Sequence, residues 1–471
     1  MMRVGPYMKH TTLLIFVLAV IIRLINLNQS LWLDEATSAM STFLYDAKTL
    51  ITQFSPRDFH PPFYYLFLDF WVQIFGNSEI SLRLPSVFFS VLTGYILMKI
   101  FRGSDLLFLF NPLIVYFSQE ARMYSMATFF VALSFYFFTK NVALKTTKIT
   151  PYYCLFLTTS ILAFYTFYAT VFFVSTAFLY LLISRKFKLF FIGVFIFFCG
   201  VSLISPLLII QLINSRQALD IVLNWSQVLG TATLKNLILI PIKFTSGRIS
   251  FEPKIIYYLV SGLWLSFISL VAFHKLAFLR QLFVKIKSLK FNELITGKYF
   301  LYIFFLSFPL IQGYFFSFFS PLLQFFRFQY LIIFLSLLLA YSISTIKKES
   351  IKKAVYMVTF SGYLFFSLLY LLIPNFHRED WKSLTLEIVK EDLPIYMIQS
   401  SSDPLKYYNK NLNSLPLQDL LFSEKIKDQF VVIPYTSEIH GVNYQSSLNA
   451  LNFEKISEKS FRGLSYEIWK K

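Results

Sequence analysis

Long apolar runs separated by short basic loops constrain this chain more than any other feature. A helix of about 20 apolar residues crosses a bilayer, and runs close to that length recur between Thr11 and Ile373. Of the 471 residues, 56% are hydrophobic and only 14% are charged, which is not typical of a soluble domain of this size. The sequence therefore predicts an all-α polytopic membrane protein.

The distribution of charge predicts how the chain is oriented. With the N-terminus inside and the loops assigned alternately, the inner loops hold 20 basic and 3 acidic residues, whereas the outer loops up to Pro374 hold 10 and 9. The segment after Pro374 holds 12 basic and 13 acidic residues. The net charge of +18 is thus concentrated in the inner loops, as the positive-inside rule describes. We expect a multi-pass plasma-membrane protein with a cytoplasmic N-terminus and no nucleic-acid partner.

About 11 spans account for this pattern, so the C-terminus is expected to be extracytoplasmic. The first span follows basic residues and lacks a small-residue cleavage site, so we interpret it as a retained signal anchor. Arg23 lies in this span, either reaching to the outer interface, which we favour, or facing a cavity. The expected spans are 11–27, 84–101, 106–117, 124–139, 151–167, 170–184, 189–210, 254–273, 299–319, 328–346 and 354–373.

The segment Phe63–Phe75 is apolar but is too short for an ordinary span, and Asp69 interrupts it. It follows Pro61 and Pro62, residues that suit the start of a helix, and we predict a juxtamembrane helix within the first external loop, residues 28–83. Counting this segment as a span would move every later basic cluster to the outer side.

The composition changes to that of a soluble domain at residue 374. Alternating patterns predict strands at Pro394–Gln399 and Gln429–Pro434 and a helix at Trp381–Lys390. We therefore divide the chain into a transmembrane catalytic domain, 1–373, and a small α/β extracytoplasmic domain, 374–471. Cys154 and Cys199 both lie in apolar runs, so we expect no disulfide and no metal site.

Polar residues gather in the loops that this topology places outside. The candidate catalytic residues are Asp34, Glu35 and Glu120, and the candidate substrate-binding residues are His60, Arg122, Tyr124, Arg327 and Tyr330. Structural alternatives stay open: acids such as Glu35 favour the first turn of a helix, a Glu–Arg pair can be a buried ion pair, and an arginine such as Arg327 can anchor at the interface.

Carboxylate and arginine on one membrane face suit one reaction in particular. A sugar linked to a lipid phosphate has an anionic leaving group, whose developing charge an arginine stabilises. The acceptor hydroxyl must lose a proton, which Asp34 can take. The membrane location follows because the polyprenyl tail of the donor stays in the bilayer.

These motifs resemble the GT-C glycosyltransferases of the protein O-mannosyltransferase and lipid A aminoarabinose transferase superfamily. The resemblance covers about the first 130 residues and rests on LDEATSA, FHPPFYY, FGNSEISLRLPS and YFSQEARMYS, with YTFYAT, RFQYL and HREDW further along. It implies the GT-C fold and transfer of one hexosyl or pentosyl group, with inversion, from a polyprenyl-phosphate donor to a hydroxyl or amine. The acceptor is a protein, a lipid or a glycan.

The resemblance also implies roles for particular residues. Asp34 looks like the acid that activates the acceptor, and Glu120 looks like the acid of the second external loop. Arg122 and Arg327 look like contacts to the donor phosphate. This chain reads QEAR in the second loop, where the mannosyltransferases carry an arginine followed later by an aspartate.

Two other classes of function compete with an enzyme. A transporter would need polar residues at mid-membrane and broken spans in two related halves, and the sequence has few charges deep in its spans. A non-catalytic envelope assembly protein would use the C-terminal domain to bind a partner. No motif identifies a cofactor, and a requirement for a divalent cation stays open.

Overall fold

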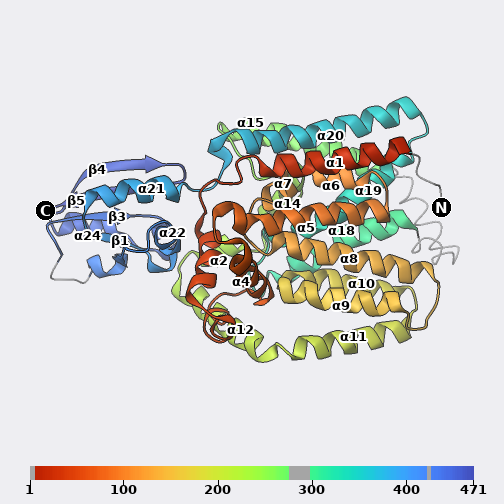
Figure 1. Cartoon of the computed structure of the whole chain (residues 1–471), viewed down its shortest axis with the longest axis horizontal. Coiled ribbons are helices and arrows are strands. Elements are labelled where there is room, and N and C mark those ends of the chain that lie inside the picture. Colours follow the sequence, from red (N-terminus) through yellow and green to blue (C-terminus); the bar gives the residue numbers. More distant parts are fainter. Residues whose placement is uncertain (1–5, 275–296, 422–425) are drawn as a thin grey trace.

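The computed structural model describes residues 6–274, 297–421 and 426–471, so the predicted basic loop around Lys285 lies outside the described residues. A bundle of helices carries a small α/β domain at one end, and the N-terminus lies at the other (Figure 1). We call these the outer and the inner end. The bundle contains α1 (Pro6–Leu24), α5 (Glu79–Ile100), α6 (Ser104–Leu109), α7 (Pro112–Phe117), α8 (Tyr124–Ala143), α9 (Pro151–Thr166), α10 (Val171–Ile183), α11 (Phe187–Ser202), α12 (Ser205–Ile221), α14 (Leu234–Ser246), α15 (Lys254–Phe273), α18 (Lys298–Phe316), α19 (Ile332–Ser344) and α20 (Glu349–Leu372).

Each expected span coincides with one of these helices or with a pair of them. Among the described residues, six helices are long and apolar enough to cross a membrane, or seven if α11 and α12 are one span bent by 71°. The number 11 itself stays a prediction. The expected span 106–117 divides into α6 and α7 because the Asn111 side chain accepts hydrogen bonds from the backbone N–H groups of Leu113 and Ile114, and Pro112 follows. This is how a new helix begins.

Arg23 does not reach the interface, so that interpretation was wrong. Its side chain is fully buried inside the bundle. It donates hydrogen bonds to the carbonyl oxygens of Ala19 (2.8 Å) and Leu109 (2.7 Å) and to the hydroxyl of Ser90 (3.2 Å). Because these acceptors belong to α1, α5 and α6, the guanidinium holds three helices together instead of facing lipid headgroups.

The first external loop folds at the outer end, beside the C-terminal domain (Figure 1). It contains α2 (Leu33–Leu44), α3 (Ala47–Thr49), the π-helical turn η1 (Leu50–Phe54) and α4 (Phe63–Phe75). The helix α4 begins after Pro62, as the proline pair predicts, and ends at Gly76, whose φ of 76° suits glycine. Phe70, Ile74 and Phe75 on α4 are exposed, as expected of a helix that lies in the interface.

The C-terminal domain is built on a five-stranded sheet in the order β2-β1-β3-β5-β4. β1 pairs in parallel with β2 and β3, whereas β5 is antiparallel to β3 and β4. Its elements are α21 (Trp381–Ile388), β1 (Ile395–Met397), α22 (Asp403–Tyr408), β2 (Ser414–Pro416), β3 (Gln429–Ile433), α23 (Ser437–His440), α24 (Tyr444–Ala450), β4 (Glu454–Phe461) and β5 (Leu464–Lys470).

Both predicted strands and the predicted helix of this domain are present, as β1, β3 and α21. The sequence did not predict the β4–β5 hairpin. β4 is an edge strand whose residues are nearly all exposed, so it lacks the alternation of apolar and polar residues by which a strand is recognised.

Close packing between α18 and the 3₁₀ helix η3 (Phe325–Leu331) depends on Gly313. A Cβ atom added at Gly313 would lie 2.2 Å from the ring of Phe328, which is fully buried. Phe328 follows Arg327 directly, so this contact also places Arg327 at the outer end of the bundle.

Replacing Gly313→Ala should therefore lower the midpoint of thermal unfolding in detergent, with a loss of about 1–3 kcal/mol that is typical of overpacking. The matched control is Gly262→Ala on α15, where an added Cβ meets no atom within 4 Å and alanine favours the helix. Equal midpoints for the two variants would contradict this account.

Candidate active site

Three loops meet at the outer end of the bundle and bring the predicted acids and arginines together. The first precedes α2 and carries Asp34 into its first turn, the second joins α7 to α8, and the third follows α20. The carboxylate of Asp34 lies 3.7 Å from Nη2 of Arg122, and the Asp34 side chain is 37% exposed, whereas that of Arg122 is 2% exposed. Asp34 is thus an accessible carboxylate beside a buried cation.

Glu35 points away from Asp34 and is fully buried in an ion pair with Arg83. Arg83 donates from Nε to Oε1 (2.8 Å) and from Nη2 to Oε2 (2.6 Å) of Glu35, and Oε1 also accepts the backbone N–H of Ala121 (2.8 Å). The remaining Arg83 donors reach the carbonyl oxygens of Leu27, Gln29 and Ser30. Since both Glu35 oxygens are engaged, this residue positions its neighbours and leaves no oxygen free for a substrate.

Arg122 is held by polar groups of the first external loop. Its Nη1 donates to the hydroxyl of Tyr65 (3.1 Å), the hydroxyl of Ser38 (3.2 Å) and the carbonyl of Asp34 (3.3 Å). Its Nε is buried without a partner among the described residues. A charged donor left without an acceptor in the interior is costly, so this nitrogen marks a place for an anionic ligand.

Among the acids at the site, Glu120 has the pKa that its surroundings raise to about 7. Its Oε1 accepts hydrogen bonds from the hydroxyl of Tyr116 (2.5 Å) and from Nη2 of Arg378 (3.1 Å), whereas its Oε2 is buried without a partner in the described chain. Arg248 donates to the same Tyr116 hydroxyl. Burial raises the pKa of Glu120 to about 7, although the charge of Arg378 acts in the opposite direction. Glu120 can therefore change its protonation state near neutral pH.

His60 takes part in a second network on the other side of Arg122. Its Nδ1 lies 3.3 Å from the carboxylate of Asp58, and the ring stacks at 6.3 Å from that of Phe167. Asp58 also interacts with Tyr65, which accepts a hydrogen bond from Arg122. His60 is partly exposed, so it can still contact a substrate.

The last three candidates come from α8 and η3. Tyr124 begins α8 and interacts electrostatically with both Arg122 and Arg327. Arg327 is half-buried, and its Nη1 donates a weak hydrogen bond to the carbonyl of Pro321 (3.4 Å). Tyr330, in contrast, is buried in the bundle and donates to the carbonyl of Ala169 (3.0 Å). Tyr330 therefore supports the packing of η3, away from the polar cluster.

Sequence reasoning missed Arg378, which comes from the loop after the last helix of the bundle. Its guanidinium lies 3.5 Å from the centroid of the Trp32 ring and 3.1 Å from Glu120. The HREDW motif contains this residue. It lies far along the chain from the other motifs, so the sequence did not indicate that it contacts them. Arg248 was missed because its long external segment has no recognisable pattern.

The polar atoms left without a partner are informative as a group. Within the described part of the chain, Oε2 of Glu120, Oε2 of Glu379, Nε of Arg122 and the indole nitrogen of Trp32 are buried and unpaired. Buried polar groups are almost always satisfied. Other unpaired atoms are scattered through the bundle, such as the hydroxyls of Ser261 and Tyr363, so it is the gathering of these four in one place that points to a ligand site. Among the described residues, no cluster of three or more His, Cys, Asp or Glu side chains could hold a metal ion.

Comparisons with known proteins agree with this arrangement. Residues 59–210 match the family model described as dolichyl-phosphate-mannose-protein mannosyltransferase. The resemblance to the GT-C superfamily is confirmed. A crystal structure of ArnT from Cupriavidus metallidurans bound to undecaprenyl phosphate is similar over 98% of both chains, with a TM-score of 0.55 and 10% sequence identity. The apo structure of that ArnT has a TM-score of 0.51, 11% identity and the same coverage.

This chain thus shares its fold with that ArnT over 98% of its length, so the likeness extends into the C-terminal domain. At 10–11% identity the likeness shows the fold, and the roles of individual residues rest on the geometry above. A search of curated proteins found no match.

The buried Glu35–Arg83 pair yields a stability prediction. Arg83→Met leaves a buried carboxylate unpaired, which typically costs about 3–5 kcal/mol, so the unfolding midpoint in detergent should fall strongly. The double variant Glu35→Gln/Arg83→Met should recover much of this loss, because a neutral amide can still accept the Ala121 N–H.

The matched control is Lys382→Met, which removes the more exposed pair between Lys382 and Glu79 (3.0 Å). Such pairs contribute about 1 kcal/mol or less. If Arg83→Met were no more damaging than Lys382→Met, the pair would not hold the site together.

Proposed function

We propose that this protein transfers a single sugar from a polyprenyl-phosphate donor to an acceptor hydroxyl or amine at the outer end of the bundle, with inversion at the anomeric carbon. The observation that carries the proposal is the pairing of an accessible carboxylate, Asp34, with a buried arginine, Arg122, whose Nε has no partner among the described residues. Undecaprenyl phosphate, bound in the similar ArnT structure, is the kind of carrier that we infer for the donor.

Arginines from two loops and from η3 would bind the donor phosphate. Arg122 offers a buried Nε, Arg327 has one weak hydrogen bond, and Arg378 is held between Trp32 and Glu120. Guanidinium groups suit phosphate because they present several donors in a fixed plane. As the bond from the anomeric carbon to the phosphate oxygen breaks, negative charge grows on the phosphate, and these cations stabilise it.

Asp34 would accept the proton of the attacking hydroxyl. Asp34 is the acid at this site that is most exposed to solvent, and the first turn of α2 fixes its carboxylate. Arg122 lies 3.7 Å from this carboxylate, so the base and the phosphate contact are held a short distance apart. Sugar transfer needs this closeness, because the acceptor attacks the carbon that carries the phosphate.

The remaining residues would position this pair. Glu35 and Arg83 tie the start of α2 to the loop before it and to Ala121, next to Arg122. Glu120 orients Arg378, and the Asp58–Tyr65 pair orients Arg122. We propose His60 and Tyr124 as further substrate contacts, an extracytoplasmic location for the outer end, and a hexosyl or pentosyl group as the one transferred.

Replacing Asp34→Asn should reduce the turnover number by about 10²–10⁴-fold, the usual contribution of a general base, with unfolding unchanged. The measurement is the consumption of labelled polyprenyl-phosphate sugars by purified protein with an acceptor-containing membrane extract. Asp69→Asn on α4, whose carboxylate pairs with Gln73, is the control from the same external loop. Full turnover in Asp34→Asn would exclude Asp34 as the base.

Donor binding should depend on pH through Glu120. Below pH about 7 the carboxyl is protonated and Arg378 keeps its full charge, whereas above it the carboxylate forms and neutralises that charge. The phosphodiester of the donor does not titrate in this range. The donor KM should thus rise roughly tenfold between pH 6 and 8.

Glu120→Gln removes the titrating group, so its donor KM should stay low and nearly constant over the same range. A KM that rises with pH equally in both proteins would assign the dependence to another group.

A further inference from the structure

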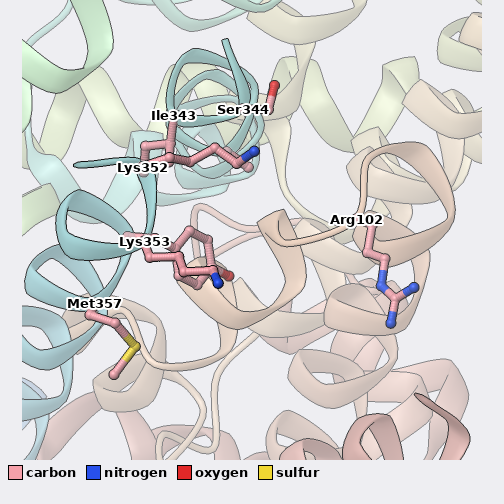
Figure 2. A pocket seen from close by; sticks show the side chains of 8 residues that line it. Arg102, Ile343, Ser344, Lys352, Lys353 and Met357 are labelled. Atoms are coloured by element: carbon pink, nitrogen blue, oxygen red, sulfur yellow. The ribbon is translucent and has the colours of Figure 1, made fainter. Parts of the chain in front are cut away.

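A pocket lies at the inner end of the bundle, far from Asp34. This pocket of about 380 Å³ opens between α19, α20 and the turn after α5, and its lining includes Arg102, Ile343, Lys352, Lys353, Tyr356 and Met357. Figure 2 shows the basic side chains of Arg102, Lys352 and Lys353 around this pocket, with Ile343 and Met357 beside them. The pocket thus combines cationic groups with an apolar wall.

A second, apolar hollow lies on the other side of Met357. A groove of about 770 Å³ runs between α15 and α20 and is lined by Trp264, Phe267, Met357, Phe365 and Phe366, among others. Met357 lines both hollows. From Met357 to Phe366 the helix rises by about 13 Å, close to the depth of one leaflet of a bilayer about 30 Å thick.

We propose that this pocket and groove bind one anionic glycerophospholipid of the inner leaflet, such as phosphatidylglycerol. Its phosphate would lie among Arg102, Lys352 and Lys353, and an acyl chain would lie along the groove against Trp264. A basic pocket next to an apolar groove one leaflet deep, with Met357 lining both, has the shape and charge of such a lipid. Basic pockets between membrane helices on the cytoplasmic side are known to take anionic headgroups.

The acids near the pocket leave room for a phosphate. Glu349 pairs with Lys352 at 2.7 Å, but both side chains are partly exposed, and such pairs are weak enough to exchange partners. Asp105 interacts with Arg102, yet its carboxylate also accepts the backbone N–H of Gly103 in the buried turn. The ammonium of Lys353 stays exposed at the rim.

A phospholipid fits this site better than the sugar donor does. The helix α2, which carries Asp34, lies at the outer end of the bundle (Figure 1), whereas the pocket is lined by the end of α19 and the start of α20 at the inner end, so a phosphate held here cannot react there. Tyr356 hydrogen-bonds to the carbonyl of Gly103 at 2.8 Å and joins α20 to the turn after α5. A lipid seated on this joint would brace α19 and α20, the helices that lead to Arg327 and Arg378.

The test compares lipid binding to the purified protein by native mass spectrometry, with phosphatidylglycerol, phosphatidylcholine and undecaprenyl phosphate added separately. Lys352→Gln/Lys353→Gln should weaken phosphatidylglycerol binding by about fivefold for each lysine removed. The control Lys347→Gln/Lys348→Gln removes the same charge at the same end, from exposed side chains that do not line the pocket, and should bind as the unmodified protein does.

A second pair of variants tests the groove without changing charge. Ser361→Trp fills the groove and should reduce phosphatidylglycerol binding, whereas Leu372→Trp, exposed on the same helix but outside the groove, should not. The proposal is overturned if both lysine pairs have the same effect, if phosphatidylcholine binds as tightly, or if undecaprenyl phosphate binds there more tightly. Activity with the labelled donor is independent of this result, so the proposed reaction can survive its failure.

Discussion

The outer end of this protein is organised around one buried ion pair. Arg83 grips both oxygens of Glu35 and, with its other donors, three carbonyl oxygens of the loop before α2, while Glu35 also holds the N–H of Ala121. Burying two charges is expensive, and the cost is offset only when every donor and acceptor is used, as it is here. The pair therefore fixes the first turn of α2, and with it Asp34, against the loop that carries Arg122. A flexible loop could not hold an acid and a guanidinium at a set distance.

Around this buried pair, several charged side chains have fewer hydrogen bonds than they could make. Nε of Arg122 has no acceptor among the described residues, Arg327 makes only a weak side-chain hydrogen bond, and Glu120 and Glu379 each keep an unpaired oxygen. In water such groups would be solvated, but in a buried site they raise the free energy of the empty protein. A ligand with both anionic and hydroxyl groups can satisfy them together, and this is the description of a sugar phosphate.

Much of the fold could be predicted from the sequence because the length of an apolar run and the charge of a loop depend only on residues that are neighbours along the chain. The proline pair and the apolar run from Phe63 to Phe75 predicted α4, and the order of motifs placed Asp34, Glu120 and Arg122 in facing loops. Tertiary contacts decided the rest. Arg23 is indistinguishable from an interfacial arginine until Leu109 and Ser90 are seen beside it. Arg378 joins the site from a distant part of the chain, and the partners of Glu35 depend on how α5 packs.

The place of Arg378 after the final helix of the bundle has a consequence for biosynthesis. The chain emerges from the ribosome with Asp34 and Arg122 early and Arg378 only after all membrane helices have been made. Its carbonyl is in turn held by Arg462, near the C-terminus. A nascent or prematurely terminated chain thus lacks the guanidinium that contacts Glu120 and Trp32, and the cluster of charges at the outer end is complete only in molecules whose synthesis has passed this residue.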